Sequence, residues 1–265
     1  FSDILGDKIG CIDGEYEIKL DNTVSPVVHA PRSVPAAIRD SVRAELDRLE
    51  KVGIIARVQK PTEWVSSMVV ARKKNGSVRI CIDPSDLNKA VKREHFPMNT
   101  IEDIATRLSG STMFSTLDAN SGYFQIKLSK HSSELTTFNT PFGRYKYLRA
   151  PMGLKCIAEV FQREMCRIFS DLPGVEIVVD DILVHGRNVN EHDQRLRNVL
   201  QRCRDVNLKL NAAKSKLRCT EVDYVGHKLT KDGLMPTDDR VKSITALPDP
   251  KDHSDLATFL GMAAY

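Results

Sequence analysis

The sequence predicts an α+β fold on three observations. Helical and strand-like stretches alternate along the chain with no internal repeat, which is typical of a fold that mixes helices and sheets. The chain has 265 residues, of which 41% are hydrophobic, enough to bury a substantial core. Two apolar, strand-like runs carry acidic residues, which buried strands ordinarily avoid. No apolar run reaches the roughly 18 residues that a membrane span needs, and no signal peptide is visible.

The first part of the chain is expected to be extended, then helical, then a hairpin. Residues 1–33 show no period and contain prolines that favour extended backbone. Apolar residues then recur at helical spacing over 38–52, and Gly53 ends that helix. Residues 64–82 predict two strands around Asn75-Gly76, because Asn-Gly between alternating apolar residues favours a hairpin turn.

The second part continues this alternation. Thr100 is expected to cap a short helix that has Asp103 in its first turn and Gly110 just beyond its end. The last helix is expected to be capped by Asp252 or Ser254. Between them the pattern predicts strand character at 113–128, a helix at 161–172, a buried run at 177–184, a helix at 190–206 and a strand at 224–229.

Positive charge is concentrated in two stretches, although the formal net charge is only +4. Residues 187–218 hold nine Lys/Arg against three Asp/Glu, and residues 71–95 hold seven against three. Such stretches suit an anionic partner, and a solvated helix face is an equally good interpretation. Among the histidines, His131 and His192 are expected at the surface.

The cysteines argue against a zinc site. They are far apart, and none forms a CxxC pair or a Cys/His cluster. Most lie in apolar or mixed runs, as reduced thiols of an intracellular protein do. The six are Cys11, Cys81, Cys156, Cys166, Cys203 and Cys219.

Two adjacent acids interrupt the buried run at 177–184. Asp180 and Asp181 are flanked by six apolar residues, five of them β-branched, so the run favours a buried strand. Adjacent carboxylates there are costly unless a cation neutralises them. We therefore predict a tight hairpin with both acids at its bend, held by a divalent metal. An exposed, inert Asp-Asp turn is the alternative.

A third acid, Asp118, ends the strand-like run that begins near residue 114. A small polar stretch and an aromatic residue follow it, and backbone N–H groups in such a stretch can hold phosphate oxygens. A strand end with an Asx-turn is the alternative. Phosphoryl transfer with two Mg²⁺ ions needs carboxylates from separate elements that converge on one point. The three acids together suit that chemistry.

The chain resembles the reverse transcriptase of gypsy-like LTR retrotransposons, a class related to retroviral polymerases. Each motif is weak alone, but their common order and spacing are very specific, and they cover nearly the whole chain. In order they are Gly-Ile-Ile at 53–55, Arg-Ile-Cys-Ile-Asp at 79–83 with Leu-Asn-Lys at 87–89, Leu-Asp-Ala-Asn-Ser-Gly-Tyr at 117–123, Thr-Phe-Asn-Thr-Pro-Phe-Gly-Arg-Tyr at 137–145, Pro-Met-Gly at 151–153 with Phe-Gln at 161–162, Val-Asp-Asp-Ile-Leu at 179–183 and Tyr-Val-Gly-His at 224–227.

The resemblance implies a right-hand polymerase fold with an antiparallel palm sheet backed by helices. The chain begins with Phe1 and stops inside a helical pattern, which we take to indicate a fragment of a longer polyprotein. The expected parts are an N-terminal extended segment at 1–33, fingers at 34–112, a palm with an interleaved part of the fingers and a primer-grip hairpin at 113–229, and the start of a truncated thumb or connection at 230–265.

The resemblance also assigns roles to single residues. Asp118, Asp180 and Asp181 match the family's catalytic triad, which binds two Mg²⁺ ions, with Mn²⁺ as a substitute. Tyr123 matches the aromatic residue that lies under the incoming sugar and excludes a 2′-hydroxyl. Arg79 matches an arginine that contacts the triphosphate. The remaining implied contacts are Lys73 or Lys74 and the backbone of Ser121 and Gly122 on the triphosphate, Met152 at the nucleotide, and Gly226 and His227 at the primer end.

The sequence departs from the family pattern at three places. Val178 stands where the family often has Tyr, and Met152 stands where retroviral enzymes carry Gln. Residues 155–160 replace a segment that usually contains a polar residue and a Pro-Ala pair. Phe161 and Trp64 are expected to be packing residues, with nucleotide contact and template stacking as the respective alternatives. All three carboxylates are intact, which favours a working enzyme.

The implied activity is RNA-directed DNA polymerisation on RNA or DNA templates with dNTPs. A catalytically silent, nucleic-acid-binding remnant is the alternative, and an RNA polymerase is disfavoured because Tyr123 would clash with a ribose hydroxyl. Ribonuclease H and integrase are expected downstream in the polyprotein, and RNase H activity is not expected within this fragment. No membrane partner is expected. The implied location is intracellular, in cytoplasmic virus-like particles with access to the nucleus.

Overall fold

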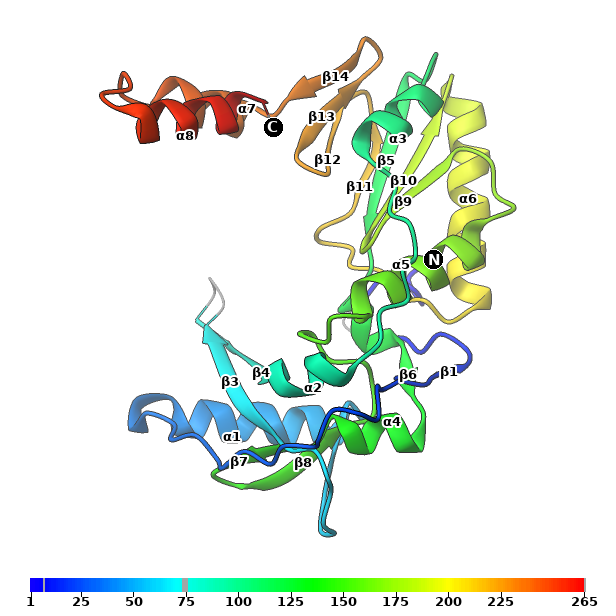
Figure 1. Cartoon of the computed structure of the whole chain (residues 1–265). Coiled ribbons are helices and arrows are strands. Elements are labelled where there is room, and N and C mark those ends of the chain that lie inside the picture. The colour runs from blue at the N-terminus through cyan, green and yellow to red at the C-terminus, as the bar shows by residue number, and fades with distance from the viewer. Residues whose placement is uncertain (7, 73–75, 265) are drawn as a thin grey trace.

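The lower lobe in Figure 1 is built on a five-stranded sheet with the order β2-β8-β7-β3-β4. This computed structural model describes residues 1–6, 8–72 and 76–264. β3 and β7 pair in parallel, and the other neighbouring strands are antiparallel. The strands are β2 (Ile55–Arg57), β3 (Ser66–Arg72), β4 (Val78–Asp83), β7 (Phe138–Thr140) and β8 (Gly143–Tyr147).

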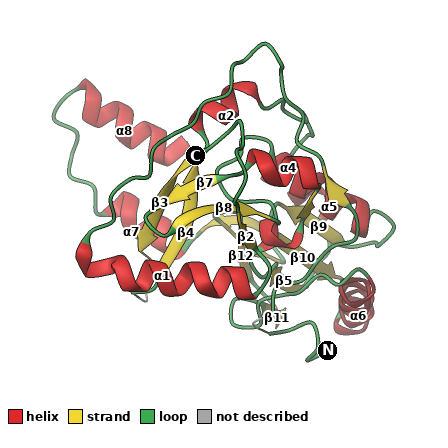
Figure 2. Ribbon diagram, turned by 90° about the horizontal axis from the view of Figure 1, so that it is seen from below, coloured by secondary structure: helices red, strands yellow, loops and turns green. Residues whose placement is uncertain are grey.

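Helices cover this five-stranded sheet, which we call the finger sheet after the expected part of the chain, because their apolar residues share one face. The helix α1 (Ala36–Lys51) buries Val42, Leu46 and Leu49, and Figure 2 shows it lying across the sheet. Gly53 follows it with a φ of 72°, the left-handed conformation that ends many helices. The shorter helices of this lobe are α2 (Ser85–Ala90) and α4 (Lys130–Leu135).

The centre of the molecule is a four-stranded antiparallel palm sheet with the order β11-β5-β10-β9. Two amphipathic helices pack on it, and Phe161, Met165 and Val199 lie fully buried between helices and sheet. The strands are β5 (Met113–Asp118), β9 (Val175–Val178), β10 (Asp181–Gly186) and β11 (Lys216–Cys219), and the helices are α5 (Ile157–Phe169) and α6 (Val189–Asp205).

A smaller core joins the palm sheet to a three-stranded sheet with the order β12-β13-β14. Ile104 of α3 (Ile101–Arg107), Phe114, Leu183 and Tyr224 are buried together in it. The strands are β12 (Val222–Tyr224), β13 (His227–Thr230) and β14 (Gly233–Pro236). This sheet runs past the boundary expected at residue 229, so the palm and the following segment share it.

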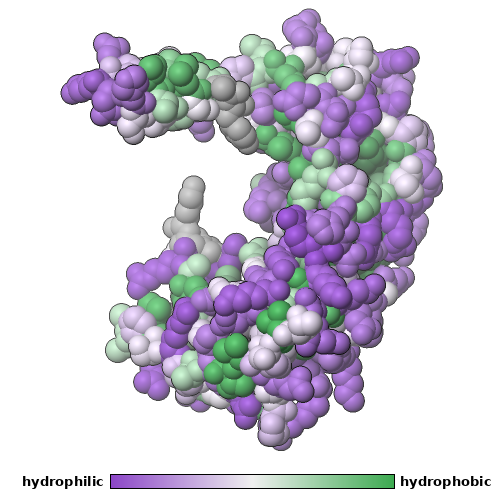
Figure 3. Space-filling model, in the orientation of Figure 1, coloured by the Kyte–Doolittle hydropathy of each residue, from purple (hydrophilic) through white to green (hydrophobic). Residues whose placement is uncertain are grey.

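The last two helices, α7 (Asp238–Thr245) and α8 (His253–Ala264), extend from this sheet as an arm (Figure 1). The described residues of α7 include no buried one. The arm and the lower lobe project from the palm in the same direction, so the molecule has the shape of a C. Figure 3 shows that side chains leave an open cleft between them. No helix of the described part of the chain is long and apolar enough to cross a membrane.

Several local predictions are confirmed. Thr100 and Asp103 form a reciprocal capping box at the start of α3. The backbone N–H of Asp255 donates to the Asp252 side chain, so Asp252 caps α8. Trp64 is buried, as expected of a packing residue. Residues 73–75 of the predicted hairpin turn lie outside the described residues, but Arg72 and Val78 on either side are cross-strand partners.

Other predictions are wrong. Strand character does not continue over 113–128, because β5 ends at Asp118 and residues Gly122–Gln125 form a 3₁₀ helix (η1) before the short strand β6 (Lys127–Leu128), which pairs with β1 (Glu15–Tyr16). The expected strand at 224–229 contains a tight turn at Val225 and Gly226, whose φ angles are 48° and 74°. His192 is not at the surface: it is fully buried, and its ring accepts or donates a hydrogen bond with Ser115.

Candidate active site

The pairing of β5 with β10 brings the three acids to one corner of the palm. Asp118, the last residue of β5, lies opposite Asp181, the first residue of β10. Asp180 precedes it in the β9–β10 turn, and its carbonyl accepts a hydrogen bond from Ala119 N–H at 3.1 Å. Side chains on directly opposed residues of antiparallel strands are near neighbours. The three carboxylates therefore lie together at one corner of the sheet.

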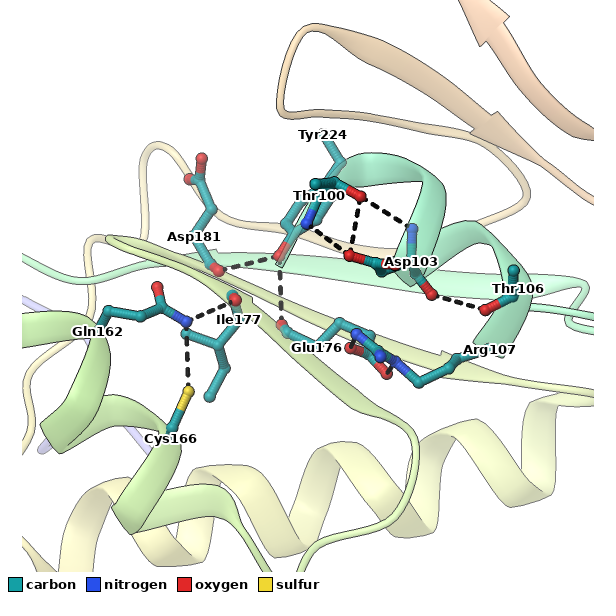
Figure 4. Close-up of polar contacts among 10 residues, drawn as sticks. All are labelled: Thr100, Asp103, Thr106, Arg107, Gln162, Cys166, Glu176, Ile177, Asp181 and Tyr224. Carbon is teal, nitrogen blue, oxygen red and sulfur yellow. Dashed lines mark hydrogen bonds and ion pairs between the residues drawn. The ribbon is translucent and has the colours of Figure 1, made fainter. Parts of the chain in front are cut away.

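The turn that carries the acid pair is tight and strained. Val178 and Asp181 pair across it, and Val179 has a φ of 51°, which is rare for a β-branched residue and costs about 1–3 kcal/mol. Gln162 of α5 holds it: its amide nitrogen donates to Ile177 C=O at 3.0 Å, and its amide oxygen accepts from Val179 N–H at 2.6 Å. Figure 4 shows Gln162 reaching from the helix to Ile177.

Sequence reasoning quoted Gln162 as part of a motif but assigned it no role. It is only 1% exposed, and a buried amide is retained where its hydrogen bonds are satisfied. The signal that marks it is a polar residue on the apolar face of a predicted helix, between Phe161 and Met165.

Tyr224 supports the same corner from the neighbouring sheet. Its hydroxyl lies 3.2 Å from Asp181 C=O and 3.3 Å from Glu176 C=O, so it bridges β9 and β10 (Figure 4). Glu176 in turn is paired with Arg107 of α3 at 2.7 Å. The backbone that carries Asp181 is thus held by a second helix and a second sheet.

The corner is electrostatically unbalanced. Burial and the charges of Asp118 and Asp181 raise the pKa of Asp180 to about 6, and burial and Asp118 also raise the pKa of Asp181. Among the described residues, Asp180 Oδ1 is a buried oxygen with no hydrogen-bond partner. Lys214 opposes both shifts, and its Nζ lies 3.1 Å from Asp118 Oδ2. A further cation would stabilise this group of acids.

The donor set fits a hard divalent cation such as Mg²⁺, which prefers carboxylate oxygens. Two such groups on the neighbouring strands β5 and β10, and Asp180 in the adjoining turn with its unpartnered buried oxygen, supply those ligands. As the side chains stand, no three His, Cys, Asp or Glu residues of the described chain are arranged to hold an ion. The carboxylates would therefore have to turn toward a common point.

The floor beside the acids is closely packed. A Cβ on Gly122 would lie 2.7 Å from Asp180 Oδ1 and 2.9 Å from the Phe161 ring, so only glycine fits there. Phe161 is fully buried, as expected of a core residue, and its ring meets that of Tyr123 edge to face at 5.6 Å. Burial first, and then the charge of Asp180, raise the pKa of Tyr123. Ser121, next to Gly122, is exposed and has a φ of 53°.

Two of the residues assigned to the nucleotide, Arg79 and Met152, contact each other. Arg79 of β4 is exposed, and its Nη1 lies 3.6 Å from Met152 Sδ. The segment that carries Met152 is held by Asn88, whose side chain donates to Gly153 C=O at 2.8 Å and accepts from Lys155 N–H at 2.9 Å. Lys73 and Lys74 lie outside the described residues.

Gly226 and His227 lie away from the acids, at the β12–β13 turn. Val225 and Gly226 form the turn, and the His227 ring nitrogen Nδ1 lies 3.0 Å from Val225 C=O. The same hairpin begins with Tyr224, which contacts the carbonyl of Asp181. The turn and the acid pair are therefore parts of one connected structure.

A family model described as reverse transcriptase (RNA-dependent DNA polymerase) matches residues 71–229, which include all three acids. The chain belongs to this family. Among its relatives, the uncharacterized protein K02A2.6 of Caenorhabditis elegans is 33% identical over 99% of this chain, and the transposon Tf2-3 polyprotein of Schizosaccharomyces pombe is 29% identical over 96%. The chain spans 21% and 19% of the lengths of these two relatives.

Solved reverse transcriptases share the fold. The foamy viral protease-reverse transcriptase in complex with double-stranded DNA matches 97% of this chain and 45% of its own, with a TM-score of 0.86 at 22% identity. The same viral enzyme with an RNA/DNA hybrid matches 98% of this chain and 35% of its own, with a TM-score of 0.84 at 21% identity. The predictions of the family and of a right-hand polymerase fold are confirmed.

Four arginines in the basic stretch at 187–218 of this reverse transcriptase chain form ion pairs with acids of the same chain. Three of these pairs tie α6 or β11 to another segment and one lies within α6, which agrees with the interpretation as a helix face more than with an anionic partner. The ion pairs are Arg195–Glu191, Arg202–Asp171, Arg204–Asp3 and Arg218–Asp193.

The segment at 155–160, which departs from the family pattern, packs inward in this reverse transcriptase. Cys156 is fully buried, and Glu159 is 4% exposed. The Glu159 carboxylate accepts hydrogen bonds from Arg93 and from the backbone N–H groups of Glu94 and His95, at 3.0 and 2.9 Å for the latter two. The unusual acid therefore holds the loop between α2 and α3.

Proposed function

We propose that this chain is an RNA-directed DNA polymerase domain that extends a primer 3′-hydroxyl with dNTPs on RNA or DNA templates. The observation that carries the proposal is the register of β5 and β10, which sets Asp118 opposite Asp181 and beside Asp180. A catalytically silent, nucleic-acid-binding remnant is disfavoured, because a remnant has no reason to keep three mutually repelling carboxylates together.

In this proposal Asp118, Asp180 and Asp181 would hold the divalent cations, two Mg²⁺ ions with Mn²⁺ as a substitute. Bound there, such ions would lower the pKa of the attacking 3′-hydroxyl and neutralise the triphosphate and the leaving pyrophosphate. The unpartnered Asp180 Oδ1 and the raised pKa of Asp180 support this role. Gln162 and Tyr224 hold the backbone of the acid pair in place.

The incoming dNTP would lie between the palm floor and the fingers. Tyr123 would contact the sugar and exclude a 2′-hydroxyl, since its ring is set against Phe161 and lies near Asp180. Arg79, beside Met152, would bind the triphosphate together with the backbone of Ser121 and Gly122. Lys73 or Lys74 would add a further positive charge.

The primer–template would occupy the cleft, with Gly226 and His227 at the primer end. The solved relatives are bound to double-stranded DNA and to an RNA/DNA hybrid, which supports this partner for the present chain. The polyprotein relative supports a Pol polyprotein of an LTR retrotransposon as the context. We also propose that this polyprotein contains ribonuclease H and integrase. Its proposed location is cytoplasmic virus-like particles with access to the nucleus.

Primer extension on an RNA template tests the proposal. With Mg²⁺ and dNTPs, Asp180→Asn should lower the rate at least about a hundredfold, because it removes a ligand and a charge together and each factor of ten is about 1.4 kcal/mol. Asp249→Asn, an exposed acid far along the chain from the site, is the matched control and should retain activity. Equal thermal melts of both variants establish that they fold. Wild-type protein without activity, or an active Asp180→Asn, would contradict the proposal.

A further inference from the structure

A lysine lies among the acids of the proposed cation site. Lys214 Nζ is 3.1 Å from Asp118 Oδ2, and the charge of Lys214 acts on both Asp180 and Asp181 against the rise in their pKa. In the sequence it belongs to the basic stretch at 187–218, whose other paired arginines hold α6 and β11. Lys214 instead lies against the carboxylates, so a purely structural role like that of the arginines does not explain its position.

The turn that carries Lys214 is fixed to the backbone of Asp118 itself. Asn211 N–H donates to Asp118 C=O at 2.8 Å, and Asp118 N–H donates to Ser215 Oγ at 3.4 Å. Ser215 also closes the turn by donating from its hydroxyl to Asn211 C=O at 2.7 Å. The base of the lysine and the carboxylate that it meets therefore move as one unit.

The lysine side chain, by contrast, is free to leave. It is 64% exposed, whereas that of Asp118 is 17% exposed. An ion pair with one such exposed partner is worth about 0–1 kcal/mol. A single ammonium group also leaves Asp180 Oδ1 without a hydrogen bond. A divalent cation brings twice the charge, so it would replace the ammonium group at small cost.

We propose that Lys214 is a resident counter-cation of the acidic corner, which partly neutralises it in the metal-free protein and swings out when divalent cations bind. The inference rests on the proposed function, because it assumes that the three acids bind those cations. Lysine and metal then compete for Asp118, and Lys214 sets how much Mg²⁺ or Mn²⁺ the protein needs. It is a positioning residue for the carboxylates and a determinant of cation affinity.

Direct titration of Mn²⁺ into the metal-free 265-residue chain, followed by calorimetry, measures this competition without any catalysis. Lys214→Met should bind Mn²⁺ about two- to fivefold more tightly than wild type, because the competing pair is worth up to about 1 kcal/mol. Lys214→Arg keeps the charge and should stay near wild type. Lys216→Met is the matched control, since Lys216 is 53% exposed and pairs with Asp223, and it should not change the affinity.

The outcomes separate the two proposals. Mn²⁺ affinity that is unchanged or weaker in Lys214→Met, with wild type binding normally, overturns the role of Lys214 and leaves the cation site standing. Wild type that binds Mn²⁺ no better than Asp180→Asn overturns the cation site and the inference with it. Lys214→Gln repeats the test with a polar side chain should the methionine variant fail to fold.

Discussion

The Tyr123 ring packs edge to face against Phe161. Burial, and then the charge of Asp180, raise the pKa of Tyr123. Phe161 is fully buried and cannot yield, so the Tyr123 ring has a fixed wall behind it. A ring held in this way excludes a neighbouring group by its volume. At the scale of single residues this predicts which sugar the site accepts.

Tyr123→Val should raise the incorporation of ribonucleotides relative to deoxyribonucleotides about tenfold or more, because the smaller side chain leaves room for a 2′-hydroxyl. The measurement is kcat/KM for one dNTP and the matching rNTP on the same primer–template. Tyr123→Phe keeps the ring and should keep the selectivity. An unchanged ratio in the valine variant would refute the role.

His185 makes a second residue-scale prediction, on stability. Its ring lies in β10, 2.7 Å from Ser111 Oγ, and burial, aided by Arg195, lowers its pKa from 6.5 to about 4. The folded state therefore keeps His185 neutral while the unfolded chain protonates it. The contribution of His185 to the free energy of unfolding is therefore fully present above pH 6.5, and it is lost as the pH falls toward about 4.

The urea midpoint of unfolding, measured in metal-free buffer at several pH values across that window, checks this. His185→Gln should have a flatter dependence on pH than wild type, because it has no group that titrates there. Other groups titrate in both wild type and the variant, so the effect of His185 is the difference between their two curves of urea midpoint against pH. Parallel curves would show that His185 does not contribute.

The β9–β10 turn is the element on which the site depends most. Its strained Val179 is held by Gln162, and its Asp181 carbonyl by Tyr224. Both supports hold backbone atoms of the hairpin and do not touch the carboxylates. A change in either would act by moving the acids relative to Asp118.

Gln162→Leu should lower kcat about tenfold or more while changing the KM for dNTP less. Leucine fills a similar volume but leaves Ile177 C=O and Val179 N–H unpaired, at about 1–3 kcal/mol each. Steady-state kinetics well below the melting temperature, together with a thermal melt, separate kcat from stability. Gln194→Leu, on the exposed side of α6, is the control. A variant that only melts earlier, with kcat unchanged, would show that Gln162 is purely structural.

Elements whose signals are local were predictable from the sequence. The capping box at Thr100 and the apolar face of α6 are set within a few residues. The burial of His192 was not, because its partner Ser115 lies 77 positions away. The end of a strand at Asp118 was expected, but the 3₁₀ helix that follows it was not. Asp118 and Asn120 bond to the distant segment 209–215, which no local pattern reveals.

The meeting of the three acids at one corner was predictable for a different reason. Asp118, Asp180 and Asp181 belong to motifs whose order is specific, so the resemblance placed them before any geometry was known. The supports Gln162, Tyr224 and Asn88 carry no charge and act through backbone atoms, which motifs do not encode. Their roles became visible only in the fold.

On the scale of the whole molecule, the cleft between the lobes is the surface that would meet a primer–template (Figure 3). Paired arginines on α6 contribute little free charge, so binding would draw on the side chains that line the cleft. Contacts to phosphates carry no base information, and they release counterions.

Affinity for a primer–template should therefore fall steeply with salt and depend little on sequence. A log–log plot of the association constant against KCl concentration should have a slope of about −3 or steeper, which corresponds to three or more phosphate contacts. Fluorescence anisotropy with two unrelated duplexes of equal length measures both properties. A salt-insensitive affinity that differs strongly between the duplexes would contradict the expectation.

The finger sheet is assembled from chain on both sides of β5, because β7 and β8 complete a sheet that β2, β3 and β4 begin. During synthesis on a ribosome, β3 thus lacks its parallel partner β7 until residue 140 has emerged. Asp118 likewise lacks its cross-strand partner Asp181 until β10 has been made. A nascent chain would carry exposed strand edges throughout that interval, which favours aggregation. Neither lobe can be excised as a contiguous piece, so shortened versions of this protein should be cut outside residues 55–219.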